Sequence, residues 1–327
     1  MNRRLALAVD GGGNKTDVLV IDASSGDTLG SAQGPGCAHQ VFGIEPALRV
    51  LIDTVELALN SAHVSADQIE HAGVYLSGID LPEEEAMFRK ALSLLSWGSK
   101  SLTVENDLFA LLRSGTSEPD ALAIVCGSGV NGALVRSDGE VFRMLALGNI
   151  VGDWGGALGM IEHALWYAAR DEDQRGEPTA LREGILNWTG MTSIHDVAVG
   201  IYLKRIQVAD WIPKLSDVFR CAHEGDKVAR VLIERQGEEI VHMARALIKR
   251  ANLQNVPLTL VLGGGVIKAH DPLLMGAIER FLKSQELKVR VIIPNAGPII
   301  GSGLLVLESM GAEPSILTRF AQQAERL

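Results

Sequence analysis

Asp107 is the side chain best placed for acid–base chemistry, because it directly follows a β-rich run at residues 101–106. The C-terminal end of a strand is where α/β folds usually carry their reacting groups. A carboxylate there can accept the proton of an attacking hydroxyl group in phosphoryl transfer. The preceding Asn106 is expected to contact the same substrate. A structural alternative stays open on spacing alone, namely that Asp107 caps the helix expected at residues 108–115.

A glycine-rich turn follows the first β-rich run of the chain and is a candidate phosphate site. Its residues are Asp10, Gly11, Gly12, Gly13, Asn14, Lys15 and Thr16. Residues without Cβ let backbone N–H groups approach phosphate oxygens closely, while Asp10 would hold a hydrated magnesium ion. The turn is not a Walker A loop, because that pattern needs Gly where Asn14 stands, and a helix rather than a strand afterwards. The alternative is a plain β-turn with a solvated Lys15.

Two further glycine turns also end β-rich runs. They are Cys126, Gly127, Ser128 and Gly129, and then Gly263, Gly264 and Gly265. The turn at 127–129 occupies the equivalent point of an internal repeat, so with the first turn it predicts two hairpins that hold one nucleotide. The turn at 263–265 would leave room for an adenine or ribose, although a single turn of this kind is more often structural.

Asp153 lies between glycines in residues 148–159, which would expose its carboxylate in a cleft where it could bind substrate hydroxyl groups. The alternative is an ordinary turn aspartate. Six histidines are scattered without the spacing of metal ligands and are assigned no function: His63, His71, His163, His195, His223 and His242.

An internal repeat organises the elements that must position these residues. Residues 5–30 and 121–144 each read as strand, turn, strand, turn, strand, with a glycine turn after the first strand. The copies start about 115 residues apart, an ordinary domain length, so they predict two similar lobes that arose by duplication. We place the lobes at residues 1–117 and 118–327.

Apolar periodicity and turn residues predict the remaining elements. Helices are expected at 46–62, 83–95 and 108–115, and strands at 71–80 and 101–107. The second lobe should contain a mostly helical insertion at about 157–251 with a polar loop at 171–179, strands at 257–267 and 288–294, and a glycine-rich helix at 297–310. The last helix, expected at 316–327, is predicted to dock on the first lobe.

Composition excludes several classes of protein. A length of 327 residues with 47% apolar and 21% charged residues is typical of a compact chain with two lobes. The formal charge of −10 disfavours a nucleic-acid partner, which calls for a basic face. No apolar run approaches the roughly 20 residues that span a bilayer, and residues 5–9 read as a buried strand rather than a signal peptide. Three cysteines far apart, Cys37, Cys126 and Cys221, fit a reduced compartment, so we expect a cytoplasmic protein.

These motifs, in this order, resemble the BadF/BadG/BcrA/BcrD-type ATPase family, which includes the N-acetylglucosamine kinases. The resemblance covers nearly the whole chain and rests on the segments DGGGNKT, END, CGSG, GDWGG, VLGGGV and GPIIGSGLLVLE. It implies an α/β fold of two ribonuclease-H-like lobes, each a mixed β-sheet flanked by helices, with the active site in the cleft between them. It further implies that ATP and Mg²⁺ are used, that Asp107 is the base, and that Asp153 is a sugar ligand. We also expect a homodimer.

Four positions depart from the family pattern and leave the identity of the sugar open. Cys37 stands where the family usually has an Asn that touches the sugar, and Trp154 replaces a usual Glu. Val130 replaces a usual Ser and Leu147 a usual Trp. A thiol hydrogen-bonds only weakly. We therefore expect either a substrate other than N-acetylglucosamine, or a poor Michaelis constant for that sugar that neighbours such as His39 and Asp153 compensate.

The pattern is compatible with three functions. The first is a kinase that transfers the γ-phosphoryl group of MgATP to a hydroxyl of an amino sugar or related hexose. The second is an ATPase that activates a dehydratase or reductase through an iron–sulfur cluster shared between subunits, which would need two cysteines from each chain. The third is a weakly catalytic sugar or nucleotide sensor, which Cys37 and Trp154 would favour. The three acidic residues Asp10, Asp107 and Asp153 are all present, and they favour the kinase.

Overall fold

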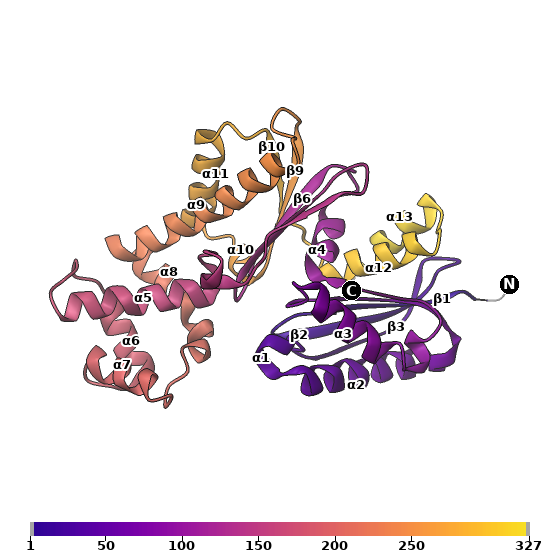
Figure 1. Cartoon of the computed structure of the whole chain (residues 1–327), viewed down its shortest axis with the longest axis horizontal. Coiled ribbons are helices and arrows are strands. Elements are labelled where there is room, and N and C mark those ends of the chain that lie inside the picture. Colours follow the sequence, from indigo (N-terminus) through magenta and orange to yellow (C-terminus); the bar gives the residue numbers. More distant parts are fainter. Residues whose placement is uncertain (1–2, 325–327) are drawn as a thin grey trace. The chain divides into compact units, whose positions relative to one another are not determined.

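The computed structural model describes residues 3–324, which divide into two compact units (Figure 1). Unit 1 comprises the described residues of Met1–Ala123, Val135–Glu140 and Val291–Leu327, and unit 2 comprises Ile124–Leu134 and Val141–Arg290. The C-terminal residues therefore belong to the same compact unit as the N-terminal ones. The predicted lobes at residues 1–117 and 118–327 follow the two copies of the sequence repeat. They are not the same division as these compact units, and they stay a prediction. No helix among residues 3–324 is long and apolar enough to cross a membrane.

The first sheet has five strands in the order β3-β2-β1-β4-β5. Their bounds are β1 Leu5–Gly11, β2 Lys15–Asp22, β3 Asp27–Pro35, β4 Ile69–Leu76 and β5 Leu102–Asn106. The predicted β-meander is present, since β1 pairs with β2 and β2 with β3 in antiparallel fashion. Strands β4 and β5 extend the sheet in parallel on the other side of β1. Parallel neighbours bring the C-terminal ends of β1, β4 and β5 to one edge, where the acidic residues follow.

Helices cover both faces of this sheet, and β1 supplies a hydrophobic core to each. Leu7 and Val9 lie in the core under α2 (Ile44–Ala62), while Ala6 and Ala8 lie in the core under α12 (Pro298–Ser309). This alternation is the two-residue period of a strand. The helices α1 His39–Phe42, α3 Pro82–Leu92, α4 Asp107–Gly115 and α13 Pro314–Ala324 complete unit 1, with short 3-10 turns at Ala66–Gln68 and Ser96–Gly98. Figure 1 shows α2 and α12 on opposite sides of the sheet.

The last helix packs against the meander of unit 1. Arg319 Nη2 of α13 donates to Asp27 Oδ1 at 2.6 Å, and Gln323 Nε2 donates to the same oxygen at 3.1 Å. Phe320 of α13 is fully buried in the core under α12. Residues 325–327 of the predicted helix lie outside the described residues.

The second sheet has five strands in the order β10-β9-β6-β7-β8. Their bounds are β6 Ala121–Cys126, β7 Val130–Val135, β8 Val141–Arg143, β9 Leu258–Gly263 and β10 Val289–Ile292. Read from the meander, β8-β7-β6-β9-β10 repeats the order β3-β2-β1-β4-β5 of the first sheet. The sequence repeat therefore extends to strand order.

The helical insertion of unit 2 forms as predicted. Its helices are α5 Gly156–Glu172, α6 Leu181–Thr189, α7 Ile194–Tyr202, α8 Leu215–His223 and α9 Lys227–Arg250, with 3-10 turns at Gly148–Ile150 and Val208–Lys214. The short α10 Gly265–Lys268 and α11 Pro272–Ser284 follow β9.

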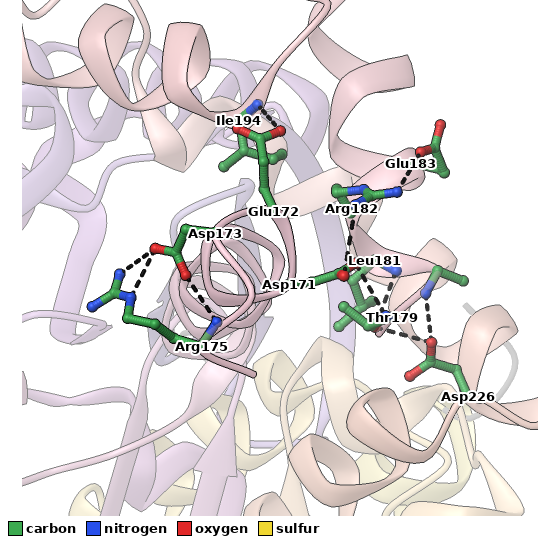
Figure 2. Close-up of polar contacts among 11 residues, drawn as sticks. Asp171, Glu172, Asp173, Arg175, Thr179, Leu181, Arg182, Glu183, Ile194 and Asp226 are labelled. Atoms are coloured by element: carbon green, nitrogen blue, oxygen red, sulfur yellow. Dashed lines mark hydrogen bonds and ion pairs between the residues drawn. The ribbon is translucent and has the colours of Figure 1, made fainter. Parts of the chain in front are cut away.

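The polar loop between α5 and α6 is held in place by the carboxylates around it (Figure 2). Asp226 Oδ2 accepts hydrogen bonds from Thr179 Oγ1 at 2.9 Å and from the Ala180 N–H at 2.6 Å. Asp173 pairs with Arg175, and Asp171 accepts from the Thr179 N–H at 3.2 Å. These acidic side chains therefore stabilise the fold of the loop.

The glycine-rich helix α12 contacts α4 so closely that one glycine has no room for a side chain. A Cβ on Gly301 would clash with the backbone carbonyl of Ala110 and lie 2.8 Å from the Ser114 nitrogen. We therefore expect Gly301→Ala to lower the free energy of unfolding by at least about 2 kcal/mol, as overpacking against backbone does. Chemical denaturation would measure this loss. Gly276→Ala is the matched control, because its Cβ meets only the mobile end of Arg280, and equal losses in both variants would contradict the prediction.

Candidate functional site

The first glycine turn connects β1 to β2 and is anchored on both sides. The Gly12 N–H donates to the Lys15 carbonyl at 2.9 Å, which closes the turn. The Cys37 N–H donates to the Gly12 carbonyl at 3.0 Å, and the Ser77 N–H donates to the Gly11 carbonyl at 2.8 Å. Segments that follow β3 and β4 therefore fix the shape of this turn before any ligand binds.

The residues of the first turn differ in what they can offer a ligand. Gly12 and Gly13 are half-buried and Asn14 is exposed. Lys15 is exposed, as the turn alternative expected, and its Nζ also lies 2.6 Å from Asp17 Oδ2. Thr16 is fully buried, and its hydroxyl donates to the Pro35 carbonyl at 2.7 Å. Thr16 therefore has a framework role in this structure, and its contact with a ligand stays a prediction.

Two carboxylates gather around the buried Cys37 thiol. Burial raises the pKa of Cys37 to about 11, with the charges of Asp10 and Asp107 adding to the rise and a hydrogen bond with Thr16 opposing it. The thiol is therefore protonated at neutral pH. Asp10 lies near the end of β1 and Asp107 directly follows β5, and both residues are half-buried.

Cys37 itself lies beneath the turn and does not line an open pocket. Its exposed fraction is 1%, and a Cβ on Gly11 would lie 2.5 Å from its sulfur. This burial does not favour the predicted contact between the thiol and a sugar, which stays a prediction. Gly11 is a packing glycine for the same reason, because its missing side chain makes room for Cys37 and Leu76.

Asn106, and not Asp107, caps helix α4. The Asn106 Oδ1 accepts the Leu108 N–H at 3.0 Å, and its Nδ2 donates to the Ile79 carbonyl at 3.1 Å and to Asp80 Oδ1 at 3.0 Å. The alternative that made Asp107 the N-cap is wrong, since Asp107 is the first residue inside the helix. The expected contact of Asn106 with substrate stays a prediction that the structure does not favour, because the residue is 1% exposed and its amide oxygen and nitrogen both bond to protein atoms.

His39 is joined to the start of α3 rather than left open to a ligand. Its Nε2 lies 3.1 Å from Glu84 Oε1. Its ring packs edge to face with the Phe88 ring, with 5.2 Å between the two ring centroids. Burial raises the pKa of Glu84, but the N–H groups of Leu81 and Asp80 and the His39 ring outweigh it and lower the value. Glu84 thus stays ionised and orients the imidazole.

The second glycine turn lies between β6 and β7 and is bonded to helix α5. The Gly127 N–H donates to the Gly129 carbonyl at 2.9 Å, and the carbonyls of Gly127 and Ser128 accept the N–H groups of Ala157 and Leu158 at 2.8 and 3.0 Å. A Cβ on Gly127 or Gly129 would have nothing within 4 Å. This turn is therefore ordered by the fold yet open on its outer side.

The third glycine turn packs against the second. Gly264 has φ +91°, and a Cβ there would clash with the Cys126 carbonyl and lie 2.8 Å from the Gly127 nitrogen. Gly263 ends β9, and Gly265 begins α10 with no atom within 4 Å of a Cβ. The second and third turns are thus neighbours in unit 2, and Gly264 is the residue that permits their close contact.

Asp153 lines a pocket of about 330 Å³ in unit 2. The pocket is bounded by the second turn, the segment around Gly148 and the start of α5; its wall includes Ser128, Gly129, Ala146, Trp154 and Leu158. Asp153 Oδ2 is buried without a hydrogen-bond partner. Burial raises the pKa of Asp153, although the N–H groups of Gly148 and Leu147 hold it down. An unpaired buried acceptor beside a pocket is typical of a ligand-binding group.

Trp154 forms a packed wall of this pocket where the family pattern has a glutamate. Its Nε1 donates to His163 at 2.9 Å, and the Arg235 guanidinium lies 4.2 Å from the ring centroid. Only 6% of Trp154 is exposed. The departure therefore replaces a charge by an ordered aromatic surface.

A second, larger pocket of about 580 Å³ lies beside the loop drawn in Figure 2, and the sequence had not pointed to it. It is lined by residues of α5, the loop and α9, among them Trp166, Arg170 and Lys227. The Arg170 guanidinium lies 4.6 Å from the Trp166 ring centroid. Trp166 is 51% exposed on α5.

Comparison with known proteins identifies relatives over nearly the whole chain. The model of the BadF/BadG/BcrA/BcrD ATPase family matches residues 7–306. An N-acetylmuramic acid/N-acetylglucosamine kinase of Clostridium acetobutylicum is 24% identical over 290 residues, 88% of this chain and 94% of that protein. An N-acetyl-D-glucosamine kinase of Dictyostelium discoideum is 21% identical over 319 residues, 94% of this chain and 99% of that protein.

Solved structures agree on the fold. A crystal structure of a candidate N-acetylglucosamine kinase from Chromobacterium violaceum has a TM-score of 0.73 at 20% identity, with 93% of this chain and 99% of that chain covered. A hexokinase of the ROK family from Thermus thermophilus has a TM-score of 0.57 at 19% identity, with 94% of this chain and 100% of that chain covered. The two five-stranded sheets flanked by helices are thus the duplicated ribonuclease-H-like fold that was predicted.

Proposed function

The chain belongs to the BadF/BadG/BcrA/BcrD ATPase family, and from this membership we propose that it is an ATP-dependent kinase that phosphorylates a hydroxyl group of an amino sugar or related hexose. The observation that carries the proposal is Asp107, a half-buried residue that directly follows strand β5 and is not the cap of α4. The two relatives named as N-acetylglucosamine kinases support the same substrate class.

In this proposal Asp107 orients the sugar hydroxyl and accepts its proton as the oxygen attacks the γ-phosphorus of ATP. The backbone N–H groups of the first and second glycine turns hold phosphate oxygens, and their bonded shapes mean that little reorganisation is needed when charge develops. Asp153 would accept a hydrogen bond from another sugar hydroxyl, which would pair its free oxygen.

The donor set of the first turn fits Mg²⁺. Among residues 3–324 no three His, Cys, Asp or Glu side chains form a cage for a metal ion, and Asp10 is the carboxylate at the turn. Mg²⁺ keeps several waters and is usually held by one or two carboxylates together with substrate phosphates. Asp10 would hold the ion at the end of β1, where its charge would neutralise the transferring phosphoryl group.

The sugar would meet a surface with more apolar character than the family pattern has. Trp154 provides an aromatic wall beside Asp153, and the Cys37 thiol is buried where the family pattern has a polar Asn. An apolar contact discriminates between substrates by only about 1–3 kcal/mol. We therefore propose broad acceptance of amino sugars and hexoses that share the hydroxyl bound by Asp153.

A panel of amino sugars and hexoses tests the function. Each sugar is incubated with MgATP, ADP release is followed, and the phosphorylated product is identified by mass spectrometry. If ATP is hydrolysed but no sugar phosphate is formed, the proposal of a sugar kinase is wrong. The activator alternative has little support, because Cys37, Cys126 and Cys221 are all buried; a brown, iron-containing protein purified without oxygen would revive it.

A cytoplasmic location and a homodimer complete the proposal. ATP-dependent chemistry and three unpaired thiols suit a reduced compartment. Light scattering of the purified protein would test the dimer.

Asp153 allows a prediction that separates binding from stability. Because its folded-state pKa is raised, the folded chain binds a proton more tightly than the unfolded chain, so ionisation of Asp153 destabilises the fold at neutral pH. This cost disappears as the pH falls through the raised pKa. Asp153→Asn should therefore leave the unfolding free energy at pH 7 unchanged or higher, while the KM for sugar rises about 100-fold or more through loss of a charged hydrogen bond.

Denaturation at pH 7 and pH 5 and sugar kinetics would measure both effects. Asp217→Asn is the matched control, because this aspartate accepts a hydrogen bond from Trp188 in the same unit, far along the chain from the pocket residues. A variant that is less stable and binds sugar normally would make Asp153 an ordinary turn residue.

A further inference from the structure

Gln236 is a buried amide at a position where the pattern of its helix calls for an apolar side chain. The buried face of α9 is formed by residues such as Leu232, Ile233, Ile240 and Val241, and Gln236 lies among them with 0% exposure. A polar side chain in such a stripe has to be explained by the bonds it makes.

Only one end of the Gln236 amide is bonded. Its Oε1 accepts the Gly156 N–H at 2.7 Å, whereas its Nε2 is buried without a partner. A buried donor without an acceptor destabilises the fold, and an apolar residue of similar volume would avoid this cost. The acceptor for Gly156 is therefore the feature of Gln236 that the fold uses.

Gly156 is the first residue of α5, and the next residues of this helix hold the second glycine turn. The N–H groups of Ala157 and Leu158 donate to the carbonyls of Gly127 and Ser128 at 2.8 and 3.0 Å. Three successive N–H groups at the start of α5 are thus bonded, the first to Gln236 and the next two to the turn.

Two glycines bring the parts of this assembly into direct contact. Gly155 has φ +111°, and a Cβ there would clash with Gln236 Oε1. Gly156 has φ +68°, and a Cβ there would lie 2.5 Å from the Gly129 Cα. The start of α5 is therefore held between Gln236 on one side and the turn on the other, with no side chain between them.

We infer that Gln236 is a positioning residue for the turn at Gly127–Gly129: by holding the first N–H of α5, it fixes the helix start whose next two N–H groups orient the turn carbonyls. The inference rests on the proposed function in one respect, since it takes this turn to bind phosphate oxygens of ATP. Gln236 would not touch the nucleotide. Its effect would pass through Gly156 and α5.

The test compares three variants of the full chain. Gln236→Met keeps the volume but removes the acceptor and the free donor, Gln236→Glu keeps an acceptor for Gly156, and Gln285→Leu is the matched control. Gln285 also accepts one hydrogen bond in unit 2, from Arg245 at 2.7 Å, and lies in the segment after α11. Hydrogen exchange is measured on the peptide that covers residues 156–160, and ATP binding is measured by calorimetry.

In Gln236→Met we expect faster exchange in residues 156–160 and an ATP affinity lowered about 10- to 100-fold, the scale of a small misplacement in a binding site. Gln236→Glu should stay within about threefold of wild type in affinity, as should Gln285→Leu. If Gln236→Met does not fold, Gln236→Leu replaces it in the same comparison.

Two results would overturn the inference. One is wild-type exchange and ATP affinity in Gln236→Met. The other is an equal loss in Gln236→Met and Gln236→Glu, which would mean that an acceptor for the Gly156 N–H at this position does not set the ATP affinity. Failure of the kinase proposal looks different. If the wild-type protein bound ATP but phosphorylated no sugar, faster exchange in Gln236→Met with weakened ATP binding would still support the positioning role.

Discussion

Asp107→Asn is expected to lower the rate of phosphoryl transfer by at least about 100-fold, the contribution of a positioned general base. The substitution keeps the size of the side chain and removes its ability to accept a proton. The fold should persist, because Asn106 supplies the cap of α4 and Asp107 is only its first helical residue. ATP binding should also survive, since the turn residues that would hold the phosphates are unchanged.

Single-turnover kinetics with MgATP and the preferred sugar would measure the loss, and calorimetry would measure ATP affinity. Asp53→Asn, an exposed aspartate on α2 of the same unit, is the matched control and should retain full activity. Near-normal turnover of Asp107→Asn would mean that another group takes the proton, and the mechanism would then lose its base.

Gly12→Val and Gly129→Val are each expected to weaken ATP binding about 100-fold or more, because a branched side chain would stand between the turn backbone and the phosphates. The structure makes these positions suitable for the test. A Cβ on Gly129 would have no atom within 4 Å, and the nearest atom to a Cβ on Gly12 would be the Lys15 carbonyl oxygen at 3.7 Å. The Cβ of either valine would not clash with protein atoms. A loss of ATP affinity would therefore show that the new side chain interferes with the bound ATP.

Thermal unfolding would verify that both variants fold, and ATP affinity would be measured by calorimetry. Gly276→Val on α11 is a control of the same chemistry, since its Cβ would meet only the Arg280 guanidinium at 3.4 Å. Gly264→Val is the opposite control: it should unfold the third turn, because φ there is +91° and its Cβ would meet the Cys126 carbonyl. Normal ATP affinity in folded Gly12→Val and Gly129→Val would remove the two turns from the nucleotide site.

The sequence by itself determined the elements and their repetition. The helix predicted at 46–62 is observed as Ile44–Ala62, and the strand predicted at 101–107 as Leu102–Asn106. Such elements are predictable because apolar periodicity and turn residues act within a few residues along the chain. The repeat predicted a second lobe of the same kind, and the second sheet has the matching strand order. The glycine turns were found for the same reason, since each ends a strand.

Roles within the site were decided by contacts that the sequence does not reveal. Asn106 was expected to bind substrate, but its amide donates to Ile79 and Asp80, 27 and 26 residues away. Cys37 was expected in a sugar pocket, but it packs beneath Gly11. Whether a polar side chain faces a ligand or the protein depends on such distant partners, which spacing along one strand or helix cannot indicate.

Glycines show the same division between local and tertiary causes. Gly12, Gly129, Gly264 and Gly301 all lie in glycine-rich segments, but only the folded chain separates them. At Gly12 and Gly129 the space around a Cβ is open to a ligand. At Gly264 and Gly301 the backbone of Cys126 and Ala110 occupies the space that a Cβ would need. The role of a glycine depends on which atoms lie where its side chain would be. Those atoms belong to segments that only folding brings close. Gln236 is the extreme case, because its partner Gly156 lies 80 residues away and only tertiary packing joins α9 to the start of α5.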